Sequence, residues 1–215
     1  MSHHEVDPEQ DPAAFWENRY RDAGQTWSGR PNAALVREVA GLPPGHALDL
    51  GSGEGGDAIW LAQEGWSVTA VEISPSALAL AARNAEAEGV AGRIRWVEAD
   101  LATWQPDGAY DLVSAQFLHS PVELPREDIL RRAATAVGPG GLLLVVGHGE
   151  FPPWSSHPHD EAPLPKPEEV LASLALHPDE WTVLTQAMID RMATGPDGSL
   201  ATLNDSVVTV RRSAS

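Results

Sequence analysis

The sequence contains no cysteine among its 215 residues. This absence excludes disulfides, thiolate nucleophiles, zinc–cysteine sites and iron–sulfur clusters. A chain of this length can bury a large core without such crosslinks, so we expect a single domain over residues 1–215. The lack of cysteine also fits a reducing cytoplasm.

Basic residues and long apolar runs are also scarce. The sequence has 14 Lys and Arg but 31 Asp and Glu, which gives a net charge of −17. This charge would repel a phosphate backbone. The first residues lack the pattern of a signal peptide, and no stretch approaches the ~18 apolar residues of a membrane span. We therefore expect a cytoplasmic protein with no nucleic-acid or membrane partner. Nothing in the composition indicates an oligomeric state.

Short apolar runs alternate with helical patterns along the middle of the chain. Two helices, over residues 12–23 and 31–40, come before the first run, and residues 1–44 are expected to form an N-terminal helical lid on a core over 45–215. The alternation predicts a parallel sheet covered on both faces. The expected strands are 46–50, 66–73, 93–99, 110–117 and 141–147, and the intervening helices are 56–64, 75–88 and 126–137.

The end of the chain follows a different pattern. A helix over 167–174 precedes two strand patterns, 181–194 and 200–212, which a Gly-Pro-Asp-Gly turn joins. The fold class expected is therefore α/β, with a Rossmann-like, doubly wound sheet of seven strands. Its strands should be mostly parallel, with a C-terminal antiparallel hairpin.

A glycine-rich loop over residues 47–56 lies between a predicted strand and a predicted helix. Glycines there let the backbone turn sharply and approach a nucleotide-like ligand at the positive end of a helix. A purely structural turn is the alternative. Gly51, Gly53 and Gly56 also match the dinucleotide spacing G-x-G-x-x-G, and Glu72 lies near the acid expected after it. The glycines alone do not show whether the ligand is a nicotinamide cofactor or a methyl donor.

Two further acids favour the methyl donor. Asp49, at the end of the first strand, would repel a pyrophosphate but attract an ammonium group. Asp100, after the third strand, is placed to accept a hydrogen bond from an adenine amino group, although a solvated loop acid is the alternative. Together with Glu72, these acids suit a ligand that carries an ammonium, a ribose diol and an exocyclic amine.

Five short motifs resemble, in order and spacing, those of class I S-adenosylmethionine-dependent methyltransferases. They are Asp49-Leu-Gly-Ser-Gly-Glu-Gly, Val-Glu72-Ile-Ser, Glu-Ala-Asp100-Leu, Tyr-Asp111-Leu-Val-Ser and Gly-Pro-Gly-Gly-Leu142. The resemblance implies S-adenosylmethionine as the cofactor and S-adenosylhomocysteine as the product. It implies glycine-loop contact with the methionine part, Glu72 at the ribose, and Asp100 and Leu101 at the adenine. The implied donor site comprises Trp27, Asp49, Gly51, Ser52, Gly53, Glu72, Ile73, Asp100, Leu101 and Gln116.

The N-terminal aromatic residues resemble the lid helix of the tellurite-resistance and thiopurine methyltransferases. Phe15, Trp16, Arg19, Tyr20 and Trp27 carry this looser resemblance, and Trp16 and Trp27 fit core anchors equally well. It implies a small-molecule acceptor. The Asn-Pro-Pro-Tyr motif of enzymes that methylate amino groups of nucleic acids and proteins is missing after the fourth strand, which argues against methylation of a macromolecular amide or base.

Two histidines at the expected ligand edge are candidates for catalysis. Methyl transfer from a sulfonium needs alignment of the acceptor, and a base only where the acceptor must lose a proton. His119 and His148 follow the fourth and fifth strands, and we expect His119 to be nearer the methyl group. If His119 is the base, the rate should fall as the pH drops through about 6.5. Histidines that only pack or hydrogen-bond are the alternative.

A histidine-rich loop follows the fifth strand. His148, His157, His159 and Asp160 are metal-ligand types, but the loop is broken by prolines and lacks a fixed spacing, so we expect no metal. With Phe151 and Trp154, the loop is expected to roof a pocket for a small acceptor. Two rival functions remain open: an NAD(P)-dependent oxidoreductase, and a non-catalytic S-adenosylmethionine-binding or metal-sensing module.

Overall fold

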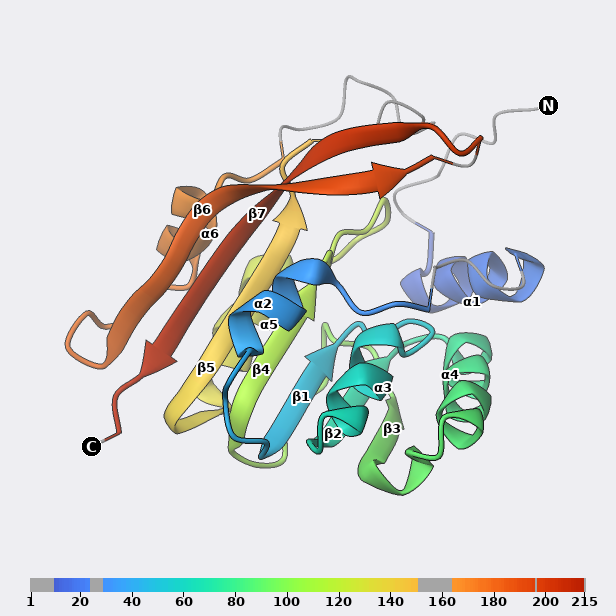
Figure 1. Cartoon of the computed structure of the whole chain (residues 1–215), viewed down its shortest axis with the longest axis horizontal. Helices are drawn as coiled ribbons and strands as arrows, with labels where there is room; N and C mark the ends of the chain where they lie inside the picture. Colours follow the sequence, from blue (N-terminus) through green and yellow to red (C-terminus); the bar gives the residue numbers. More distant parts are fainter. Residues whose placement is uncertain (1–9, 24–28, 151–163, 196, 215) are drawn as a thin grey trace.

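The computed structural model describes residues 10–23, 29–150, 164–195 and 197–214. One sheet organises the molecule, with the strand order β3-β2-β1-β4-β5-β7-β6 (Figure 1). The first five strands are parallel, and β7 runs antiparallel to both β5 and β6. The predicted fold class is confirmed. The strands are β1 (His46–Leu50), β2 (Ser67–Glu72), β3 (Ile94–Glu98), β4 (Tyr110–Gln116), β5 (Val137–His148), β6 (Trp181–Thr194) and β7 (Leu200–Arg212).

Helices connect the parallel strands, as the alternating pattern predicts. They are α1 (Pro12–Ala23), α2 (Ala33–Val39), α3 (Gly56–Gln63), α4 (Pro75–Ala87), the short 3₁₀ turn η1 (Ala91–Arg93), α5 (Arg126–Thr135) and α6 (Pro167–Ser173). None of the helices in the described ranges has the length and apolar character needed to cross a membrane. The single domain, the lid role of residues 1–44 and the cytoplasmic location stay predictions.

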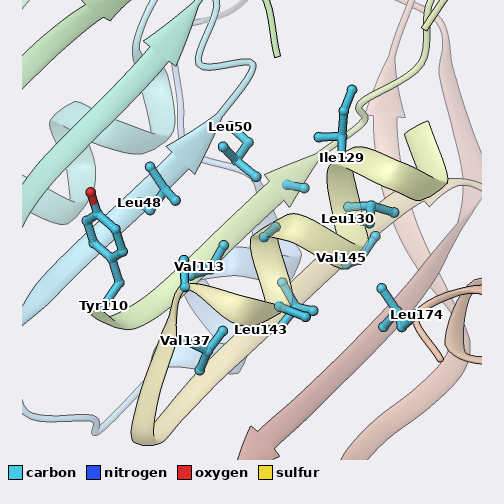
Figure 2. Packing of buried hydrophobic residues seen from close by; sticks show 14 of the residues in the cluster. Leu48, Leu50, Tyr110, Val113, Ile129, Leu130, Val137, Leu143, Val145 and Leu174 are labelled. Carbon is cyan, nitrogen blue, oxygen red and sulfur yellow. The ribbon is translucent and has the colours of Figure 1, made fainter. Parts of the chain in front are cut away.

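Two apolar clusters hold the helices to opposite faces of the sheet. On one face, Leu130 of α5 packs with Leu143 and Val145 of β5, and Figure 2 shows these three among 14 residues of the cluster. On the other face, Leu35 of α2 belongs to a cluster that includes Leu144 of β5. Burying each such side chain contributes about 1.5–3 kcal/mol. The strand ends that carry polar residues are therefore fixed by a rigid core.

The fifth strand begins at Val137, four residues before the predicted start at Gly141, and α5 ends at Thr135. The register with β4 shifts between Tyr110 and Leu112, so this glycine-rich stretch enters the sheet through an irregularity. A Cβ on Gly141 would lie 2.8 Å from the carbonyl oxygen of Tyr110. Gly141 of the Gly-Pro-Gly-Gly motif is needed for this close backbone approach.

Candidate functional site

The glycine loop forms a tight turn from β1 into α3. Gly51, Gly53 and Gly55 have φ angles of 69°, 51° and 82°, in the left-handed region that favours glycine. The N–H groups of Gly51 and Ser52 both donate to the carbonyl of Val71, at 2.9 and 3.0 Å. The turn is thereby attached to the end of β2.

The carboxylate of Glu72 supports the same turn. Its Oε2 accepts a hydrogen bond from Gly53 N at 2.9 Å, and its Oε1 accepts from the N–H groups of Ile73 and Ser74 at 2.9 and 3.0 Å. Burial raises the pKa of Glu72, and these hydrogen bonds oppose the shift. A carboxylate oxygen has two lone pairs, so Oε2 retains capacity for a ligand hydroxyl. The loop-supporting role of Glu72 was not anticipated from the sequence.

Asp49 places a second buried carboxylate at the end of β1. It is 2% exposed, and its Oδ2 has no hydrogen-bond partner in the described part of the chain. Burial raises the pKa of Asp49 well above its usual range, and the nearby negative charges of Asp57 and Glu72 raise it further. An ionised carboxylate in this position is costly unless a cation pairs with it.

Two more buried acceptors without partners lie near Asp49. Within the described ranges, Ser52 Oγ and Gln116 Oε1 have no hydrogen-bond partner. Leu50 of β1 and Ala115 of β4 are register partners at the carboxyl edge of the sheet. Ser52 and Gln116 come shortly after these two residues, so they lie at neighbouring strand ends. Native buried polar atoms are nearly always hydrogen-bonded, and exceptions point to a missing partner. This group of atoms fits a ligand that brings hydrogen-bond donors.

The remaining predicted donor-site residues are further along the same edge. Asp100 follows β3, and its Oδ1 accepts a hydrogen bond from Ala102 N at 2.8 Å, while the neighbouring Leu101 is buried. The structure thus places the predicted residues on the ends of β1, β2, β3 and β4. Trp27 is outside the described residues.

The segment after β4 lies over the glycine turn. Phe117 has a φ of 50°, and its N–H donates to the carbonyl of Val146 at 2.8 Å. A bulky residue rarely adopts this conformation unless the surroundings enforce it, and such positions cluster at functional sites. A Cβ on Gly51 would lie 2.9 Å from Leu118 Cδ1, so this segment and the turn are in close contact.

His119 and His148 lie side by side at this edge. Their rings stack with centroids 5.6 Å apart, and the backbone N–H of His148 donates to His119 Nε2 at 3.3 Å. Burial, followed by the charges of Arg126 and His148, lowers the pKa of His119 to about 3. His119 is therefore neutral throughout the physiological range. This pKa does not support the expected fall in rate near pH 6.5 from protonation of His119, because desolvation disfavours the imidazolium.

The predicted histidine-rich loop falls largely outside the described residues. Phe151, Trp154, His157, His159 and Asp160 all belong to the undescribed range 151–163. Among the residues that the structure does describe, no group of three or more His, Asp or Glu is arranged to hold a metal ion.

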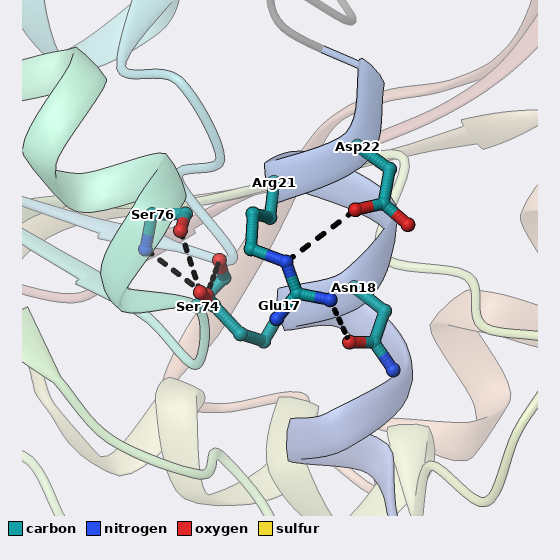
Figure 3. Close-up of polar contacts among 6 residues, drawn as sticks. All are labelled: Glu17, Asn18, Arg21, Asp22, Ser74 and Ser76. Carbon is teal, nitrogen blue, oxygen red and sulfur yellow. Dashed lines mark hydrogen bonds and ion pairs between the residues drawn. The ribbon is translucent and has the colours of Figure 1, made fainter.

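Helix α1 is attached next to Glu72 by a residue that sequence reasoning missed. Glu17 accepts hydrogen bonds from Ser74 Oγ at 2.7 Å, from Ser76 N at 3.0 Å and from Ser76 Oγ at 2.5 Å (Figure 3). These bonds lower the pKa of Glu17, the one to the Ser76 side chain most. The carboxylate thus lies at the N-terminus of α4, where negative charge is favourable. No local signal in the sequence marks this contact.

We expect Glu17→Ala to loosen α1 without unfolding the core. Losing these charged hydrogen bonds should lower the local opening free energy by about 1–2 kcal/mol, so amides of α1 should exchange roughly 5- to 30-fold faster. Hydrogen exchange by mass spectrometry measures this. Asp22→Ala, which removes an exposed partner of Arg21 on the same helix, is the matched control. Equal exchange in both variants would show that Glu17 does not hold α1.

A second missed pair anchors α2. Asp57, in the first turn of α3, accepts from Asn32 N and Asn32 Nδ2, both at 2.7 Å. Burial raises the pKa of Asp57, and the hydrogen bonds from Asn32 counteract the rise. Asp57 therefore fixes the start of α2 against α3, close to the glycine turn.

Comparison with known proteins finds a family match within the chain. Residues 47–141, the segment from β1 to β5, match the model of the methyltransferase domain family. This segment is therefore similar to a methyltransferase domain. An oxidoreductase is not favoured, because the matches in sequence are named as methyltransferases.

Similarity to individual proteins covers different shares of the chain. The 2-heptyl-1-hydroxyquinolin-4(1H)-one methyltransferase of Mycobacteroides abscessus is 31% identical over 66% of this chain and 63% of its own length. A structure solved in work on the conversion of a disulfide bond into a thioacetal group during echinomycin biosynthesis has a TM-score of 0.68 and 25% identity, covering 94% of this chain and 93% of its own. TehB from Haemophilus influenzae shares the fold, with a TM-score of 0.62 and 17% identity over 92% of this chain and 67% of its own.

The curated relatives differ in size and in acceptor. The chain spans between 31% and 63% of the length of eight of the curated relatives that it matches. Some are named for small molecules and others for ribosomal RNA or a ribosomal protein. The methyltransferase domain alone therefore does not specify an acceptor.

Proposed function

We propose that this protein is an S-adenosylmethionine-dependent methyltransferase that acts on a small molecule. The observation that carries the proposal is the group of buried acceptor atoms without partners, Asp49 Oδ2, Ser52 Oγ and Gln116 Oε1, beside the glycine turn. S-adenosylmethionine offers donors of the matching kind, and when bound it supplies a methyl group already activated on a sulfonium.

Each predicted donor-site residue has a chemical role in this proposal. Asp49 pairs with the ammonium, and Glu72 accepts a ribose hydroxyl through Oε2. Asp100 and Leu101 hold the adenine. The remaining residues, Gly51, Ser52, Gly53, Ile73 and Gln116, line the methionine and ribose, and Trp27 stays assigned to the same site. The protein then aligns the acceptor for in-line displacement and excludes water.

The net charge of −17 supports the small-molecule acceptor. A chain with this charge repels a nucleic-acid backbone unless its few basic residues are clustered. The segment after β4 and the histidines His119 and His148 lie at the carboxyl edge beside the glycine turn, where an acceptor would meet the methyl group. His119 can contribute a hydrogen bond, but its pKa of about 3 makes it a poor proton acceptor near neutral pH.

A panel of acceptors tests the proposal. Thiols, selenite, tellurite, halides, phenols, amines and imidazoles are assayed for S-adenosylhomocysteine release, with ribosomal RNA and ribosomal protein in parallel. We expect turnover of at least one small molecule. Turnover of RNA or protein alone would contradict the acceptor class, and donor binding without any turnover would favour a non-catalytic module.

We expect Glu72→Gln to weaken S-adenosylhomocysteine binding at least about tenfold. The amide keeps the size of the side chain but replaces one acceptor oxygen with a donor, and a hydrogen bond to a charged group contributes about 1.5–3 kcal/mol. Glu72→Ala is less informative, because it removes all three hydrogen bonds that support the turn, whereas the amide oxygen of Gln keeps at least one of them. Calorimetric titration measures the dissociation constant.

Glu98→Gln is the matched control for this change. Glu98 is the register partner of Glu72 on β3 and is exposed. Its substitution should leave the affinity unchanged. Equal affinities for the wild type and a folded Glu72→Gln variant would remove Glu72 from the donor site.

A further inference from the structure

Asp205 of β7 is a buried carboxylate outside the donor site. It is 4% exposed, although aspartate is disfavoured in strands. Its Oδ2 accepts a hydrogen bond from Arg191 Nε at 2.6 Å, whereas its Oδ1 is buried without a hydrogen-bond partner in the described ranges. Leaving one oxygen of a buried charge unsatisfied costs free energy. Packing alone does not explain this residue.

The sheet places Asp205 directly beside His148. The two residues are register partners in the antiparallel pair of β5 and β7. In an antiparallel pair of strands, hydrogen-bonded and non-hydrogen-bonded residue pairs alternate. Gly149 N donates to Asn204 O at 2.9 Å, so Gly149 and Asn204 form a hydrogen-bonded pair. The preceding pair, His148 and Asp205, is therefore a non-hydrogen-bonded pair. Side chains approach most closely in such pairs, with Cβ atoms about 4.5–5.5 Å apart on the same face.

Neighbouring rings fix the imidazole of His148. It stacks on Phe117 with centroids 4.4 Å apart and on His119 at 5.6 Å, and the guanidinium of Arg191 lies 5.5 Å from the Phe117 ring. The strained Phe117 therefore connects this stack to the segment over the glycine turn. Stacking on the rings of Phe117 and His119 fixes the plane of the imidazole, and the strand register puts it on the same face of the sheet as the Asp205 side chain.

The charges around this pair come from several elements. Arg191 of β6 and Arg37 of α2 act on Asp205, and Arg126 of α5 lies near the neutral His119. Burial raises the pKa of Asp205, and the two arginines lower it. An ionised Asp205 stabilises a protonated imidazole next to it.

We propose that Asp205 is a positioning residue that orients His148 and raises its proton affinity, making His148 the base for acceptors that must lose a proton. This inference rests on the proposed methyl transfer. The acceptor forms its new bond to the methyl carbon as the sulfur–methyl bond breaks, and the electron pair of that bond stays on the sulfur. The acceptor's proton passes to the imidazole of His148. The acceptor class is a small molecule with a hydroxyl, thiol or azole N–H.

Titration of the histidines by nuclear magnetic resonance tests the pairing without any turnover. In the full-length protein, with His148→Gln used for assignment, Asp205→Asn should lower the pKa of His148 by about one unit or more. Asp190→Asn is the matched control, because Asp190 is exposed on β6 and bonds Asn204 instead. An unchanged His148 pKa in Asp205→Asn would overturn the proposal, whether or not an acceptor is found.

Kinetics separate positioning from a structural role. With an acceptor that carries a proton, such as a phenol, Asp205→Asn should lower kcat about 10- to 100-fold and shift the acidic limb of the pH profile downwards. With iodide, which has no proton to lose, the same variant should act like the wild type. Equal losses with both acceptors would overturn the proposal. Should Asp205→Asn fail to fold, Asp205→Ser, which also removes the negative charge, replaces it in both experiments with the same expected results.

Discussion

Gly51→Val should abolish binding of S-adenosylhomocysteine, with a loss of affinity greater than about 100-fold. Gly51 has a φ of 69°, a conformation that is a genuine outlier for a β-branched residue. A Cβ there would lie 2.9 Å from Leu118 Cδ1, so the added side chain would displace the segment over the turn. The valine would also occupy space beside Asp49 and Ser52, which we assign to the ligand.

Gly41→Val separates loss of the site from backbone strain. Gly41 has a φ of 78°, and a Cβ there would meet nothing within 4 Å. Both variants should lose stability because of the strained backbone, but Gly41→Val should keep the wild-type dissociation constant in calorimetry. Normal binding by Gly51→Val would mean that the glycine loop is only structural.

Asp49→Asn should have opposite effects on binding and on stability. Truncating one partner of a buried charge pair costs about 2–5 kcal/mol, so donor affinity should fall at least about 30-fold. The free protein should become more stable, by at least about 2 °C in Tm at pH 8, because a buried charge without a partner is removed.

The pH dependence of Asp49 has a definite sign. Its pKa is raised in the folded state, so its contribution to stability is present below the unfolded pKa of about 3.9 and is lost as the pH rises through the folded value. The Tm advantage of Asp49→Asn should therefore shrink as the pH falls. A cationic ligand favours ionised Asp49, so binding should release a proton, detectable by titration in buffers of different ionisation enthalpy. Equal proton release by wild type and Asp49→Asn would contradict this role.

Local patterns in the sequence predicted most of the fold. The bounds of α1, β6 and β7 agree with the predicted ranges, because helical periodicity and a Gly-Pro-Asp-Gly turn are strong local signals. The glycine loop was recognisable because its positive φ angles require glycine. The start of β5 could not be recognised from the sequence, because the irregularity there depends on the approach of Tyr110 from another strand.

The contacts that tune the site join distant parts of the sequence. Glu17 meets Ser74 and Ser76 only because α1 packs on α4, and Asp205 lies next to His148 only through the antiparallel register of β7. An aspartate two residues before the β-branched run 207–210 of β7 was the one available signal for that pair. The depressed pKa of His119 follows from burial, which a linear sequence does not reveal.

Calorimetric titration of the full chain with S-adenosylhomocysteine and with NADH tests the central claim most directly. The buried Asp49 carboxylate should attract the ammonium of the first ligand and repel the pyrophosphate of the second. We predict one-to-one binding of S-adenosylhomocysteine and no measurable binding of NADH. Tight binding of NADH with no binding of S-adenosylhomocysteine would contradict the assignment of this site.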